Sequence, residues 1–238
     1  MKQTLIFILI ILIGCSSTMR TSEHAPSLEL YNLKGSVEYF SDKKTPSLFI
    51  DKGWEILDDT SQLGSISFQN KYFDKKGYLT NLKYYDKDSA LILNSEILYS
   101  NSGKYNGSKD FDKKGTPIKI TEIIVSTSNF LELETYDFKT RDLMSKSKTE
   151  YENGLPTHQS SENLNQNLKS YYTFKRDKEN NEIEISSIME FGEQKMENVS
   201  NIKYLEFDSI GNWTKRIDYN REKGNECMLT IRKLTYYE

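Results

Sequence analysis

Large apolar and polar residues alternate at every second position in several short stretches of the chain. The clearest are 131–134 (Leu-Glu-Leu-Glu), 183–185 (Ile-Glu-Ile) and 213–219 (Trp-Thr-Lys-Arg-Ile-Asp-Tyr). Successive side chains of a β-strand point to opposite faces, so this alternation predicts strands with one buried face and one solvent-exposed face.

A turn motif, an aromatic residue followed by Asp, two variable residues and Gly, separates such stretches three times. The copies are Phe73-Asp74-Lys75-Lys76-Gly77, Phe111-Asp112-Lys113-Lys114-Gly115 and Phe207-Asp208-Ser209-Ile210-Gly211. Asp accepts hydrogen bonds from the backbone amides just ahead of it, and Gly supplies the positive φ that reverses the chain. Each copy therefore predicts a hairpin turn whose aromatic residue is anchored in the core. Looser versions occur at 136–137 (Tyr-Asp) and 151–154 (Tyr-Glu-Asn-Gly).

Composition supports strands throughout the chain. There are 16 Tyr and 11 Phe, whereas the only alanines are Ala25 and Ala90. Ala favours helices, and aromatic residues favour strands, so the fold class is predicted to be all-β. The stretch 157–169, rich in Ser, Asn and Gln, favours a long loop over a poor helix built on Leu164 and Leu168.

The turn motif resembles the tyrosine-aspartate (YD) repeats of bacterial Rhs-type proteins, and more closely the short divergent repeats of Bacteroidota lipoproteins. The resemblance lies in 73–89 and in 207–219, followed by 231–237. It implies antiparallel hairpin repeats that form a curved, extended or partly closed sheet, as a single domain over 31–238. Rhs repeats build a shell around a toxin, but this chain is too short for that role.

The N-terminus carries a targeting signal. Lys2 precedes the apolar run 5–13, which ends at Gly14 and Cys15. This run covers about half of a bilayer core, so residues 1–14 are predicted to be a signal peptide that is removed. The string LIGC resembles the lipobox of bacterial lipoproteins, which implies cleavage between Gly14 and Cys15 and lipid attachment to Cys15. The alternative is an ordinary secretory leader, and 15–30 is predicted to be a lipidated tether.

Charge and cysteine content narrow the function classes. The formal net charge is −3 and the basic residues are dispersed among acidic ones, which disfavours a nucleic-acid partner. Lipidation of Cys15 would leave Cys227 without a partner, so no disulfide is expected and Cys227 is predicted to act as a small hydrophobic residue.

No recognisable catalytic motif, cofactor site or metal site is present in the sequence. The two histidines, His24 and His158, lie in no metal-binding or nucleophile motif, and the turn aspartates lack the oxygen density of a calcium loop. A hydrolase using two carboxylates is the remaining catalytic alternative. Trp54 and Trp213 are candidate ligand platforms, although a core position is favoured for Trp213.

These features predict a non-catalytic binding or structural module of the cell envelope, held on the membrane by the lipid on Cys15. An open β-face or sheet edge would contact an envelope protein. The alternatives are an immunity-type lipoprotein that neutralises a periplasmic toxin, and a glycan-binding surface lipoprotein. Surface-exported Bacteroidota lipoproteins carry an acidic cluster after the cysteine, whereas Ser16 and Ser17 follow Cys15. This departure favours the outer membrane with a periplasm-facing position over the cell surface.

Overall fold

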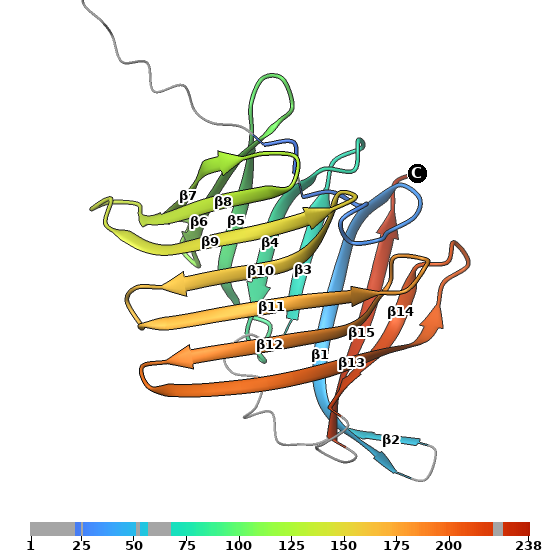
Figure 1. Ribbon diagram of the computed structural model, residues 1–238. Coiled ribbons are helices and arrows are strands. Elements are labelled where there is room, and N and C mark those ends of the chain that lie inside the picture. Colours follow the sequence, from blue (N-terminus) through green and yellow to red (C-terminus); the bar gives the residue numbers. More distant parts are fainter. Residues whose placement is uncertain (1–21, 25, 51–52, 57–67, 221–225) are drawn as a thin grey trace, which may run out of the picture.

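The computed structural model describes residues 22–24, 26–50, 53–56, 68–220 and 226–238 (Figure 1). The predicted signal peptide, Gly14 and Cys15 lie outside the described residues. The described part contains no helix, which confirms the all-β prediction there. Its strands are β1 Val37–Ile50, β2 Gly53–Ile56, β3 Phe68–Phe73, β4 Leu79–Tyr85, β5 Leu91–Tyr99, β6 Tyr105–Asp112, β7 Pro117–Ser126, β8 Phe130–Asp137, β9 Leu143–Glu152, β10 Leu155–Asn163, β11 Leu168–Arg176, β12 Glu182–Phe191, β13 Gln194–Phe207, β14 Trp213–Tyr219 and β15 Glu226–Tyr236.

The sheet closes into a barrel. From β3 to β15 each strand pairs with the next one along the chain, and β1 pairs with both β3 and β15. The barrel therefore has 14 strands, with β2 paired to the far end of β1. Closure corrects the expectation of an open or partly closed sheet, because the β1–β15 pairing satisfies the backbone groups that two edge strands would expose.

The aspartates of the turn motif form the turns of this barrel. Asp112 Oδ1 accepts from the amides of Lys114 and Thr116, both at 2.8 Å, and Asp74 and Asp208 bond the corresponding amides. Gly115 has φ +79°, as the reversal requires. The same pattern occurs without glycine in three further turns, which begin at Asp86, Asp137 and Asp177 and place Ser89, Arg141 and Asn180 at positive φ.

The aromatic residues before these aspartates differ in burial. Phe73 is 3% exposed, Phe111 is half-buried, and Phe207 is 54% exposed. The core position expected for Phe207 is therefore wrong. Two register shifts between Tyr204 and Phe207 change the direction of the side chains just before the turn.

Residues 157–169 are not a long loop. They belong to a hairpin in which β10 pairs with β11, from His158 opposite Thr173 to Asn163 opposite Leu168. No apolar alternation marks residues 157–163, because both faces of β10 carry polar side chains there and the apolar residues of the hairpin follow on β11. Pairing with β9 and β12 supplies the strand conformation that the composition did not indicate.

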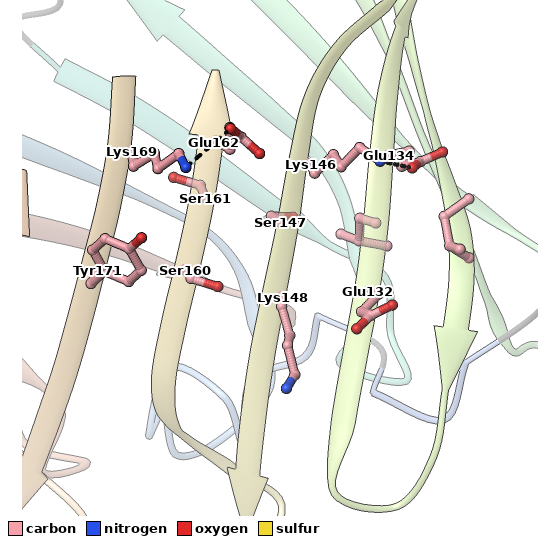
Figure 2. Close-up of a pocket in the computed structure, with 12 residues that line it drawn as sticks. Glu132, Glu134, Lys146, Ser147, Lys148, Ser160, Ser161, Glu162, Lys169 and Tyr171 are labelled. Atoms are coloured by element: carbon pink, nitrogen blue, oxygen red, sulfur yellow. Dashed lines mark ion pairs between the residues drawn. The ribbon is translucent and has the colours of Figure 1, made fainter. Parts of the chain in front are cut away.

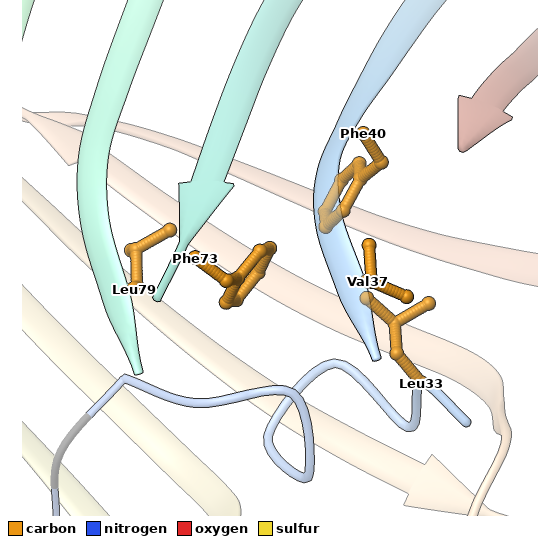
Figure 3. Packing of buried hydrophobic residues seen from close by; sticks show 5 residues of the cluster. All are labelled: Leu33, Val37, Phe40, Phe73 and Leu79. Carbon is orange, nitrogen blue, oxygen red and sulfur yellow. The ribbon is translucent and has the colours of Figure 1, made fainter. Parts of the chain in front are cut away.

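The hydrophobic core lies toward one end of the barrel. Val37 and Phe40 of β1 pack with Phe73 and Leu79 of the β3–β4 hairpin (Figure 3). Tyr31 contacts both phenylalanines edge-on, with ring centroids 5.7 and 5.9 Å apart. A second cluster, formed by Tyr105, Ile123 and Leu131, continues the core along β6 to β8.

Residues 22–24 and 26–36, here called the plug segment, cross this end of the barrel. Ser22 exchanges backbone hydrogen bonds with Tyr105, and Leu28 donates to the carbonyl of Gly77. Further along, the Asn212 side chain bonds the backbone of Lys34 through both its oxygen and its nitrogen, at 2.7 and 2.9 Å. Among the described residues, contacts with the barrel are present from Ser22 onward, so the tether boundary predicted at residue 30 falls inside packed structure.

Candidate functional site

A groove of about 310 Å³ runs across β8 to β11 on the face that points away from the core (Figure 2). Leu131 of β8 is buried in the core, and the residues that follow it, Glu132, Leu133 and Glu134, line the groove. The period of two of a β-strand exposes Lys146 on β9.

Strand register arranges the groove side chains in two rows. The first row crosses the sheet as Glu134, Lys146, Glu162 and Lys169, with acidic and basic residues alternating. Lys146 Nζ lies 3.0 Å from Glu134, and Lys169 Nζ lies 3.6 Å from Glu162. Opposite charges on neighbouring strands stabilise this pairing.

The second row interrupts this charge alternation. It runs Glu132, Lys148, Ser160 and Tyr171, so a small hydroxyl and an aromatic ring stand where the first row has an acid and a base. Ser160 is short between two long neighbours, which makes the hollow, and Tyr171 is 41% exposed beside it. Lys148 Nζ contacts Glu150 on its own strand at 3.0 Å.

A second hollow of about 280 Å³ shares Lys148, Ser160 and Tyr171 with the groove. His158 lies in it, with Nδ1 3.8 Å from Glu150. The other histidine is elsewhere: His24, in the plug segment, stacks on Tyr151 with ring centroids 3.9 Å apart. The structure therefore places the two histidines at separate positions.

The electrostatics of the groove suit binding. Hydrogen bonds from Tyr136 and Lys146 lower the pKa of Glu134, and the Lys148 hydrogen bond and charge lower that of Glu150. A carboxyl that acts as a general acid near neutral pH needs a raised pKa. The lowered pKa values instead favour the ionised carboxylates of Glu134 and Glu150, which are fixed negative charges on this face.

The other residues singled out from the sequence lie away from the groove. Trp213 is 6% exposed, so its ring is not an open platform for a sugar. Trp54 lies in β2, opposite Phe49 of β1. Burial raises the pKa of the Cys227 thiol, which donates to the carbonyl of Ser47 at 3.2 Å.

The described residues include no group of His, Cys, Asp and Glu side chains placed to hold a metal ion. Within the same residues, no helix has the length and apolar character needed to cross a membrane.

The groove residues were not predicted from the sequence as a binding site. Their signal is the period-two pattern of charges on β8 and β9, in which acids on one strand face bases on the next. That signal needs the strand register to be read, and the prediction of a loop over 157–169 concealed four of the twelve lining residues, Ser160, Ser161, Glu162 and Lys169.

No protein-family model matches the chain, and no curated protein matches it. Among solved structures, a porin-like protein from Bacteroides uniformis is 7% identical with a TM-score of 0.44, and the alignment covers 84% of this chain and 98% of that one. A porin-like protein from Bacteroides vulgatus is 8% identical with a TM-score of 0.38, covering 86% and 99%. A LolA superfamily protein from Nitrosomonas europaea is 7% identical with a TM-score of 0.23, covering 90% and 95%. Similarity at this level assigns no function.

Proposed function

We propose that this protein is a lipid-anchored, non-catalytic binding module of the bacterial cell envelope that contacts a protein partner through the groove on β8 to β11. The observation that carries the proposal is the groove itself, where Tyr171 stands exposed beside ordered, ionised Lys and Glu side chains. Tyrosine is enriched at protein contact sites, and the rim around such a contact is polar.

The charges on the barrel wall support a position outside the bilayer. Lys–Glu pairs stand on β8 to β13, including Lys175 with Glu184 at 2.6 Å and Lys195 with Glu197 at 2.7 Å. A barrel wall immersed in lipid presents an apolar band, and lysines there are costly. Membrane attachment would then come from a lipid on Cys15, as the lipobox resemblance implies.

The plug segment supports an orientation on the membrane. Cys15 precedes Ser22, the first described residue, which bonds the barrel, by seven residues. An extended chain spans about 3.5 Å per residue, so the plugged end would lie within roughly 25 Å of the lipid. The groove, on the side of the barrel, stays accessible to a partner in the periplasm.

Closure of the barrel restricts the ways in which a partner could bind. Edge-to-edge pairing with β1 or β15 is disfavoured because these strands pair with each other. Side-chain contacts on a sheet face, as in the groove, remain available.

Site-specific crosslinking in intact cells tests the groove. A photoreactive residue replaces Tyr171, and the matched control replaces Val199, which is 43% exposed on β13. We expect a defined protein adduct from position 171 that is absent from position 199. Identical adducts at both positions, or none at 171, would contradict the proposal.

The anchor is tested separately by metabolic labelling with a fatty acid. Cys15→Ala is expected to abolish labelling and to leave an unprocessed or mislocalised chain. Cys227→Ala is the matched control, because Cys227 is the other cysteine of the chain. Unchanged labelling in Cys15→Ala would overturn the anchor.

A further inference from the structure

A cavity of about 80 Å³, separate from the two hollows on β8 to β11, lies inside the plugged end of the barrel. Its wall is formed by the plug segment, by the β11–β12 hairpin and by side chains of β13, β14 and β15. Asn180, in the β11–β12 turn, lines the cavity and is exposed, so the cavity reaches the surface there.

The cavity wall is rich in positive charge. Three guanidinium groups line it, those of Arg176, Arg216 and Arg232, and the one carboxylate among its lining residues is Glu182. Glu182 pairs with Arg176 at 3.1 Å. The carboxylates that pair with the other two arginines, Asp218 and Asp42, are not part of the lining. The lining therefore carries more positive than negative charge.

Arg232 is held rigidly and keeps an unused donor group. Its Nε and Nη2 donate to the two oxygens of Asp42 at 2.7 and 2.8 Å. Its guanidinium carbon lies 3.6 Å from the ring centre of Trp213 and 4.1 Å from that of Phe40. The side chain is 6% exposed, and its Nη1 is buried with no hydrogen-bond partner among the described residues.

An unpartnered guanidinium donor at a buried position is costly, and native structures rarely leave one. The remaining nitrogen, Nη1, can donate a charge-assisted hydrogen bond to an oxygen of a carboxylate or a phosphate. The side-chain amides of Asn32 and Asn181 also line the cavity, and Asn32 Nδ2 donates to Asn181 Oδ1 at 2.7 Å. We propose that this cavity binds a small oxyanion of the phosphate or carboxylate type, with Arg232 as its buried contact.

Calorimetric titration of the purified full-length chain in detergent tests this site. Sodium phosphate and sodium acetate are the two probes, and sodium chloride at equal ionic strength is the control for screening. We expect saturable binding of one ion per chain for at least one oxyanion and none for chloride. The two probes distinguish a phosphate site from a carboxylate site.

Arg232→Lys is the first variant, because lysine keeps a charge beside Asp42 but removes Nη1. We expect affinity to fall by about tenfold or more, as the loss of a charge-assisted hydrogen bond implies. Near-UV circular dichroism checks that this variant is folded.

A second pair of variants keeps the test decisive if Arg232→Lys does not fold. Arg176→Met with Glu182→Met removes an ion pair from the cavity wall without changing the net charge. Lys175→Met with Glu184→Met removes an ion pair from the groove-side face of the same two strands, where it lies at 2.6 Å. The first is expected to weaken oxyanion binding, and the second to leave it unchanged. No saturable binding of either oxyanion, or equal binding by the wild-type chain and both cavity variants, would overturn the proposal.

Discussion

Two five-strand regions of the barrel differ. The region around β1, β3, β4, β14 and β15 is called the first half below, and the region formed by β9 to β13 is called the second half; β5 to β8 lie between them. The first half buries Phe40, Lys71, Trp213 and Arg232. In the second half, Ser170 and Ile202 are the buried residues, and β9, β10 and β12, which are described throughout, contain none. In Figure 1 the labelled strands β10 to β13 run across the view, and β1, β3 and β4 cross behind them.

This difference separates the region that stabilises the fold from the region that carries most of the proposed contact surface. Burial of apolar area concentrates the free energy of unfolding near the plugged end. The strands of the second half are held mainly by backbone pairing and by exposed ion pairs, which contribute little each. Their outward residues can therefore vary with a binding partner at small cost to the fold.

The largest expected effect is in the core. Phe40→Ala removes a ring that is fully buried between Tyr31, Phe73 and Arg232, and should lower the free energy of unfolding by about 3–5 kcal/mol. Ser147→Ala on β9 is the control and should cost less than about 1 kcal/mol. Urea unfolding measures both. Equal losses would refute the division between the halves.

Lys71→Met should stabilise the same core. Burial lowers the pKa of Lys71 to about 7, although Asp42 opposes the shift. Between that pH and about 10.4 the unfolded chain holds a proton that the folded chain lacks, so wild-type stability rises with pH across this window. Lys71→Met should be more stable by about 1–4 kcal/mol near pH 7, and the advantage should shrink toward pH 10. An advantage that does not change with pH would contradict this account.

A smaller effect is expected from the turns. Burial alone would raise the pKa of Asp208, but hydrogen bonds from Tyr236 and from backbone amides outweigh it and lower the pKa. Its contribution is therefore present above the unfolded pKa of about 3.9 and lost as pH falls through the folded value. Asp208→Ala should cost about 1 kcal/mol at pH 7 in thermal unfolding.

Asp112→Ala is the matched control for that turn. Its carboxylate makes the same backbone bonds, but no bond to a tyrosine is seen there among the described residues. The decrease in melting temperature should be smaller than for Asp208→Ala. The reverse order would show that the contact with Tyr236 adds nothing.

The smallest effect is expected in the groove. Lys146→Met breaks the contact with Glu134, whose partner lysine is 52% exposed, so stability should change by less than about 0.5 kcal/mol. Chemical unfolding at low and high salt measures it. A loss comparable with that of Phe40→Ala would show that the second half is part of the stabilising core.

Sequence patterns predicted the first half better than the second. Around Trp213 the apolar alternation and the Asp208 turn are both explicit, and a strand follows there. Over residues 157–163 of β10 both faces are polar, so no hydrophobic period was present there and a loop was predicted over 157–169. Closure also escaped prediction, because it depends on a pairing between residues about 190 positions apart, such as Asp42 and Arg232, and a single sequence does not encode partner choice at that range.

The β1–β15 pairing also sets an order of folding. The hairpins from β3 to β14 join neighbours in the chain and need only short loops to close. This pairing joins the first and last strands of the barrel, so it forms only after the C-terminal strand β15 has been synthesised. Until then one edge of β1 and the growing end of the sheet stay unpaired, and a chaperone that covers strand edges would protect the chain during that interval.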